Sequence, residues 1–76
     1  NPMNNNGTIA FELNRKEDVY IEIYSITGKL MKRVTQSGLV AGQHNIQFGV
    51  NELSNGTYIV RLKAGDRVET AKFIKQ

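Results

Sequence analysis

The 76-residue sequence has no cysteine, no tryptophan and a single histidine. Without cysteine, neither a disulfide nor a thiolate metal site can stabilise the chain. No apolar run approaches the roughly 18 residues that a transmembrane helix needs. The first residues lack the basic start and apolar stretch of a signal peptide, and the chain begins with Asn1 instead of Met. The length excludes a two-domain enzyme. We therefore expect residues 1–76 to be one small domain taken from a longer protein.

The net charge of +3 is unevenly distributed along the chain. Residues 1–28 carry four acids and two bases, a balance of −2, whereas residues 29–76 carry eight bases and three acids, a balance of +5. A basic second half is compatible with an anionic partner such as nucleic acid, an acidic membrane surface or an acidic protein. Solvated Lys and Arg on strand faces explain the same excess without a partner, so charge alone selects no function.

Apolar residues alternate with polar ones along most of the chain, which is the pattern of half-buried β-strands. The alternation predicts strands over residues 8–13, 18–24, 29–35, 43–48, 57–63 and 67–74, with a short seventh near 50–53 or 38–41. Turn sequences such as S-I-T-G and S-N-G-T separate the strands. Short strands at this spacing predict an all-β sandwich or a small barrel.

The inward positions of these strands predict the hydrophobic core, namely Ile9, Phe11, Leu13, Val19, Ile21, Ile23, Leu30, Val34, Ile46, Phe48, Leu53, Tyr58, Val60 and Leu62. The last strand is ambiguous. Alternate residues from Val68 to Ile74 share one face, and Ala71 and Phe73 share the other. Because both faces hold apolar residues, this strand is either covered on two sides or presents an apolar edge to a partner.

Few residues support catalysis or metal binding. His44 is the single histidine, and the sequence places neither a nucleophile nor an orienting carboxylate beside it. Adjacent Glu17 and Asp18 point to opposite faces of a strand and make a poor metal clamp, and Asp66 fits a turn. No glycine-rich loop leads into a helix that would bind phosphate. We therefore expect no enzyme activity, no cofactor and no metal.

Nucleic-acid binding is a stronger hypothesis than catalysis. Three basic residues cluster within residues 29–33, and Tyr20 and Tyr24 lie on one strand face. Aromatic side chains in such positions can stack on the nucleobases of single-stranded nucleic acid. Glu22 lies between the two tyrosines and would repel phosphates. We therefore expect no nucleic-acid partner, and steep salt-dependent binding to single-stranded oligonucleotides would be needed to reverse this expectation.

Five blocks in order along nearly the whole chain resemble the type A C-terminal sorting domain of the type IX secretion system of Bacteroidetes. They are N-P followed by I-x-F-x-L at the start, V-Y-I-E-I-Y-S-I-T-G-K-L, A-G-Q-H-N-I-Q-F, L-S-N-G-T-Y-I-V-R-L, and T-A-K-F-I-K-Q at the end. Each block alone is a turn glycine beside apolar strands, and their order makes the match specific. Two positions depart from the family. Ser25 stands where Asp is frequent, which could alter a turn hydrogen bond, and Phe48 stands where Trp is frequent, which is a plausible exchange in the core.

The resemblance implies an Ig-like antiparallel β-sandwich of about seven short strands at the C-terminus of a secreted cargo protein. The cargo would cross the inner membrane with its own N-terminal signal, and the outer-membrane translocon would read the folded domain in the periplasm. A surface sortase would then cleave at or upstream of Asn1 and join the cargo to an anionic lipopolysaccharide at the cell surface. In this account the domain is a substrate of the sortase and not an enzyme.

The resemblance also implies roles for particular residues. Gly28, Lys29, Gly42, Gly56, Tyr58 and Leu62 match family positions that serve the fold. An exposed edge strand or tail can be recognised by strand addition, and the candidates for that contact with the translocon are Lys72, Phe73, Ile74, Lys75 and Gln76. A plain closing strand of the sandwich explains the same five residues equally well. An apolar last strand also leaves a homodimer through an edge strand open.

A second class of domain shares this strand pattern and has a different function. An Ig-like accessory module for carbohydrate binding or adhesion is also a short sandwich with glycine turns. The position of the domain in its parent gene separates the two readings, because a sorting domain ends a large secreted cargo. Binding of the isolated domain to a glycan array would favour the accessory module.

Overall fold

The computed structural model describes residues 2–3 and 6–76, and every regular element among them is a β-strand. The strands are β1 (Pro2–Met3), β2 (Asn6–Leu13), β3 (Glu17–Ser25), β4 (Leu30–Leu39), β5 (Gly42–Gly49), β6 (Gly56–Ala64) and β7 (Arg67–Lys75). Burial alternates residue by residue along β3 and β6, as it does in a strand with one face on a core. The predicted all-β class is therefore confirmed.

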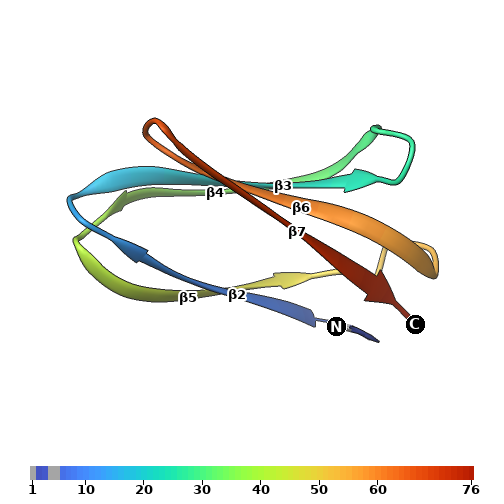
Figure 1. Ribbon diagram of the computed structural model, residues 1–76. Coiled ribbons are helices and arrows are strands. Elements are labelled where there is room, and N and C mark those ends of the chain that lie inside the picture. Colours follow the sequence, from blue (N-terminus) through green and yellow to red (C-terminus); the bar gives the residue numbers. More distant parts are fainter. Residues whose placement is uncertain (1, 4–5) are drawn as a thin grey trace.

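The strands form two sheets that pack face to face (Figure 1). The five-stranded sheet has the order β1-β7-β6-β3-β4, and the two-stranded sheet pairs β2 with β5. β1 runs parallel to β7, and the other pairs are antiparallel. Two separate sheets make the fold a sandwich and not a barrel.

The connections between the strands follow the immunoglobulin pattern. β2 pairs with β5 and β3 pairs with β6, although the β2–β3 and β5–β6 connections each cross from one sheet to the other. Strands B, E, C and F of immunoglobulin domains are arranged in this way, with β7 in the place of strand G. β4 then extends the sheet beyond β3, as strand C′ does in variable domains.

The described residues contain six long strands instead of about seven, because no strand flanks β2 or β5. The predicted short seventh strand is wrong at both positions. Residues 38–39 complete β4, and residues 50–53 form a turn in which the Leu53 N–H donates to the Val50 carbonyl at 3.1 Å. β1 is an additional two-residue strand that the hydrophobic pattern did not predict.

The β3–β4 turn depends on a glycine. Gly28 has a φ of 93°, in the left-handed region that favours glycine, and its N–H donates to the Ser25 carbonyl at 2.9 Å. The Ser25 hydroxyl accepts a hydrogen bond from the Lys29 N–H at 3.1 Å. Serine at position 25 therefore supplies a turn hydrogen bond through its side chain.

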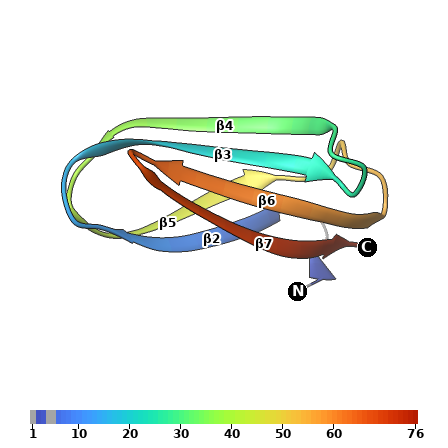
Figure 2. The ribbon, with the colours of Figure 1, turned by 45° about the horizontal axis from the view of Figure 1, so that its top comes forward.

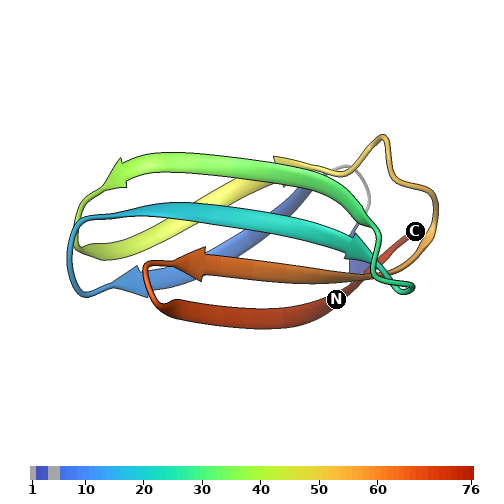
Figure 3. The same ribbon diagram turned by 90° about the horizontal axis from the view of Figure 1, so that it is seen from above.

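Both described ends of the chain lie at one end of the sandwich. Figures 2 and 3 show the β2–β3, β4–β5 and β6–β7 connections together at the opposite end. β1 pairs with the end of β7, with Pro2 opposite Ile74 and Met3 opposite Lys75. The N-terminal strand and the C-terminal tail are therefore neighbours.

The core lies between the two sheets and is centred on β3 and β6. Its buried apolar side chains are Phe11, Leu13, Val19, Ile21, Ile23, Ile46, Phe48, Val50, Leu53, Tyr58, Val60, Leu62, Ala64 and Phe73. Most predicted core residues are confirmed, although Ile9 and Val34 are only partly buried. The prediction that Leu30 points inward is wrong. A register shift after Ile23 sets Leu30 opposite Tyr24 on the outer face, where it is 47% exposed.

The structure resolves the ambiguous last strand. Phe73 points inward and is buried, with its ring stacked on Tyr58 at 5.3 Å and edge-on to Phe48 at 6.5 Å. Val68 and Ile74 lie on the opposite face and are exposed. The strand therefore packs on the core through Phe73 on one face, and its other face is exposed.

This register gives a stability prediction. Replacing Phe73→Ala empties a buried aromatic site and should lower the free energy of unfolding by about 3–5 kcal/mol. The neighbouring change Ile74→Ala, on the exposed face, should cost less than about 1 kcal/mol. Chemical denaturation of both variants measures the difference. A tolerated Phe73→Ala beside a severely destabilised Ile74→Ala would show that the register is shifted by one residue.

Candidate recognition site

The five tail residues do not share one environment. Phe73 is buried in the core, whereas Lys72 and Ile74 lie on the outer face of the five-stranded sheet, opposite Ile59 and Thr57. Lys75 is partly exposed, and Gln76 follows β7 and is exposed. The tail thus combines one anchoring side chain with neighbours that a partner can reach.

β7 leaves most of its outer edge open. β1 pairs with that edge only at Ile74 and Lys75, and within residues 2–3 and 6–76 no strand pairs with the edge from 67 to 73. A two-residue parallel pairing supplies few hydrogen bonds. An unpaired edge is a template for a strand of another chain.

An apolar depression of about 150 Å³ lies beside this edge. It is lined by Thr8, Ile9, Phe48, Val60, Ala71, Lys72 and Phe73. Ala71 shares the inward row with Phe73, opposite Val60, yet it is exposed because the depression separates it from β2. The two-stranded sheet therefore leaves a small apolar hollow next to the tail.

The opposite edge of the same sheet, β4, is protected. Lys32 lies on its inward row, opposite Ile23, and its Nζ donates to the Gly49 carbonyl and to Glu52 Oε2, each at 2.7 Å. An inward-pointing lysine on an edge strand opposes the addition of a further strand. The two edges of the five-stranded sheet thus differ in their capacity to pair.

The basic cluster predicted at 29–33 is not one patch. Lys29 is exposed in the β3–β4 turn, Lys32 points inward, and Arg33 points outward with its guanidinium 4.9 Å from the centre of the Tyr20 ring. Glu22 lies beside Arg33, with 3.7 Å between Oε2 and Nε. Alternation along the strand separates bases that are adjacent in sequence.

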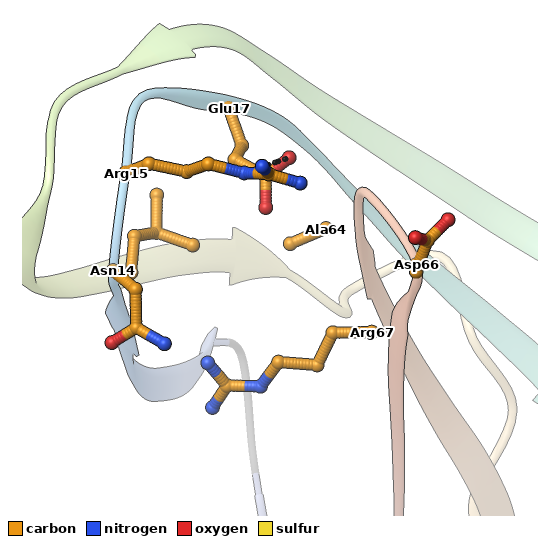
Figure 4. A pocket seen from close by; sticks show the side chains of 7 residues that line it. Asn14, Arg15, Glu17, Ala64, Asp66 and Arg67 are labelled. Carbon is orange, nitrogen blue, oxygen red and sulfur yellow. Dashed lines mark ion pairs between the residues drawn. The ribbon is translucent and has the colours of Figure 1, made fainter.

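An open depression of about 320 Å³ lies at the end of the sandwich that carries the β2–β3 and β6–β7 connections (Figure 4). Arg15 and Glu17 form an ion pair across 3.8 Å at its wall. Arg67 donates from Nη1 to the Glu12 carbonyl at 2.6 Å and from Nε to Glu69 Oε2 at 2.7 Å. These charged groups are therefore engaged by partners within the chain.

His44 and Asp18 also have structural partners. The His44 ring stacks on Phe11 with 5.6 Å between centroids, and its Nε2 lies 2.6 Å from the Val40 carbonyl. Asp18 accepts a hydrogen bond from the Gly38 N–H at 2.8 Å. Over the part of the chain that the structure describes, no three His, Asp or Glu side chains gather as metal ligands, and no helix is long and apolar enough to cross a membrane.

The remaining motif residues lie at positions that build the fold. Gly42 and Gly56 open β5 and β6 with φ values of 124° and 150°. The buried Tyr58 donates its hydroxyl to the Ser54 carbonyl at 2.6 Å, which closes the loop before β6. Leu62 is buried on the inward row of β6.

The described part of the chain is thus a small β-sandwich with an open sheet edge that ends at its C-terminal tail, and such an edge can pair with another chain. The family model of the secretion system C-terminal sorting domain matches residues 1–76, and the chain belongs to this family. It is a C-terminal sorting signal for type IX secretion, as the sequence blocks indicated, and nothing supports the accessory-module alternative. Neither a search of curated proteins nor one of solved structures found a match.

Membership in this family has direct consequences. A C-terminal sorting domain implies an N-terminal cargo in the same chain and contact with the type IX machinery. It also implies transit through the periplasm to the cell surface or to the medium. The family is one of sorting signals and not of known enzymes.

The hydrogen bond between Lys32 and Glu52 at the β4 edge gives a prediction about the pH dependence of stability. The hydrogen bond from the Lys32 ammonium holds the pKa of Glu52 below its usual range. A lowered folded-state pKa stabilises the fold fully above the ordinary glutamate pKa, and that contribution is lost as the pH falls through the lowered value. The stability difference between the natural chain and Glu52→Gln should therefore shrink as the pH falls from about 6 to about 3.

Urea midpoints across that pH range measure the difference. The control is the same comparison in a Lys32→Met background, which lacks the ammonium. There the stability difference that Glu52→Gln makes should change much less with pH. An unchanged pH dependence in that background would show that Lys32 does not lower the pKa of Glu52.

Proposed function

We propose that the outer-membrane translocon reads this domain in the periplasm by adding a strand to the edge of β7 and contacting the tail at 72–76. The open edge is the observation that carries the proposal, since β1 covers it only at Ile74 and Lys75. Backbone hydrogen bonds supply affinity in strand addition, and side-chain pockets supply specificity. The apolar depression beside Lys72 and Phe73 supplies such a pocket.

Anchoring of the tail supports the same proposal. Phe73 is held by Tyr58 and Phe48, so the positions on either side of it are fixed relative to the sandwich. A fixed tail loses little conformational freedom on binding, which favours recognition. A signal that works on unrelated cargoes must be self-contained, and a tail anchored in its own fold meets this requirement.

The cargo joins the domain on the N-terminal side, beside the tail. Because β1 pairs with the end of β7, a partner strand that extends along the whole of β7 displaces β1 from Ile74 and Lys75. A surface sortase then cleaves at or upstream of Asn1, which lies outside the described residues. The domain is thereby a substrate of the sortase, and the cargo reaches the cell surface or the medium.

A homodimer that forms through the five-stranded sheet would use the same edge. Lys32 opposes pairing at β4, which leaves β7 as the open edge of the five-stranded sheet in the described part of the chain. Dimerisation through β7 and recognition by the translocon are then mutually exclusive.

An export assay tests the role of the tail. Residues 1–76 are fused behind a reporter that carries an N-terminal signal peptide, in a host with the type IX system. Deleting residues 74–76 removes the end of the tail that follows Phe73 and keeps Phe73 in the chain. Export of the truncated fusion should fall by roughly tenfold or more, as it does when a central binding contact is lost, with the reporter retained in the periplasm.

Asn45→Ala on the two-stranded sheet is the control, because it changes an exposed side chain outside the tail. This variant should be exported like the natural sequence. Equal export of the truncated and full fusions would refute the tail contact. Export of the reporter without residues 1–76 would refute the sorting role itself.

A further inference from the structure

The two outward faces of the sandwich differ in chemistry. The outer face of the two-stranded sheet consists of small and amide side chains, all exposed, in the cross-strand pairs Thr8–Gln47, Ala10–Asn45 and Glu12–Gln43. We call this the amide face. It carries one carboxylate and no base, and its largest side chains are amides and a glutamate.

The outer face of the five-stranded sheet is aromatic, aliphatic and basic. Its cross-strand rows are Leu30–Tyr24–Ile59–Lys72, Arg33–Glu22–Arg61–Thr70 and Thr35–Tyr20–Lys63–Val68. We call this the basic face. Within these three rows, four cations against one carboxylate leave a charge of +3. The exposed Asp18, which precedes the rows on β3, adds a second carboxylate to the outer face and accepts a hydrogen bond from the Gly38 N–H.

The single carboxylate of the three rows is already engaged. The Tyr24 hydroxyl donates to Glu22 Oε1 at 2.9 Å, Arg61 Nη1 lies 3.8 Å from the same oxygen, and Arg33 Nε lies 3.7 Å from Oε2. Only 12% of the Glu22 side chain is exposed. A partner therefore meets the positive charges around Glu22 and little of its negative charge.

Both tyrosines of this face already have partners within the face. The Arg33 guanidinium covers the Tyr20 ring, and Tyr24 is tied to Glu22. The reachable surface includes aliphatic side chains at Leu30 and Val68, which are 47% and 46% exposed, among the cations of the face. Aliphatic side chains among cations favour a protein partner, because proteins offer carboxylates and apolar side chains together, whereas nucleic acids and anionic polysaccharides bind chiefly through their charges.

We infer that the basic face is a docking surface for an acidic, partly apolar protein surface of the secretion machinery, in addition to the contact at the tail. The inference rests on the proposed function, and Lys72 connects the two sites because it belongs both to the tail and to the first row of the face. Three rows of four residues make a contact at the small end of protein interfaces, as in transient complexes. A sorting signal that must be released after export suits such a contact.

A charge-matched pair of variants tests the inference in the export assay. Ile59→Glu with Lys63→Gln changes the basic face, and Gln43→Glu with Gln47→Glu changes the amide face. Each pair lies four residues apart on one strand face and lowers the net charge by two units. Because like charges across an interface repel, the first pair should lower export by about tenfold, and the second should leave it within about twofold of the natural fusion.

The outcomes separate the inference from the proposed function. If deletion of residues 74–76 blocks export and the basic-face pair does not, the tail contact holds and the docking face is wrong. If the basic-face pair blocks export and the tail deletion does not, the docking face holds and the tail contact is wrong. Protease resistance of the periplasmic fusion shows whether each variant is folded.

Photocrosslinking provides a readout that needs no destabilising change. A benzophenone residue replaces Thr70 on the basic face or Asn45 on the amide face, both of which are exposed. Thr70 should give a discrete, protease-sensitive adduct, identified by mass spectrometry as a component of the secretion machinery with an acidic contact peptide, and Asn45 should give none. A protease-resistant adduct, equal labelling from both positions, or no adduct would overturn the inference.

Discussion

A sheet of two strands covers a sheet of four long strands, and the rest of the structure follows from this mismatch. β2 and β5 place Phe11, Ile46 and Phe48 over the middle of the larger sheet, where Ile21 and Leu62 are fully or almost fully buried. The cover does not reach both outer strands. β4 and β7 are the outermost long strands of the larger sheet, so each has an edge that needs either protection or a partner.

The two edges meet this need in different ways. At β4, Lys32 turns inward and joins the strand to the loop after β5 through Gly49 and Glu52. At β7, Phe73 fixes the strand from the inside, and only two residues of β1 cover the edge from the outside. The apolar depression thus lies beside the tail, and the open edge extends from there along β7 toward the β6–β7 turn. The same geometry connects the tail to the basic face, because alternate residues of β7 point outward.

The alternation of apolar residues was enough to predict the strands and most of the core, since one buried face imposes a period of two. It failed where the period is interrupted. The register shift after Ile23 turned Leu30 outward, which no count along the sequence reveals. It also could not choose the inward face of the last strand, because Phe73 and Ile74 are both apolar and only packing against Tyr58 separates them. The basic face depends on pairing between β3, β4, β6 and β7, so its charges, spread over residues 33–72, are not adjacent in sequence.

Amide hydrogen exchange on a cargo fusion can show whether the translocon recognises the folded sandwich through β7. Exchange is compared between the free fusion and the fusion bound to the purified outer-membrane translocon. The account predicts slower exchange along β7, where added backbone hydrogen bonds protect amides, with little change along β5 on the amide face. Protection confined to β4 or β5, or faster exchange throughout the chain on binding, would contradict it.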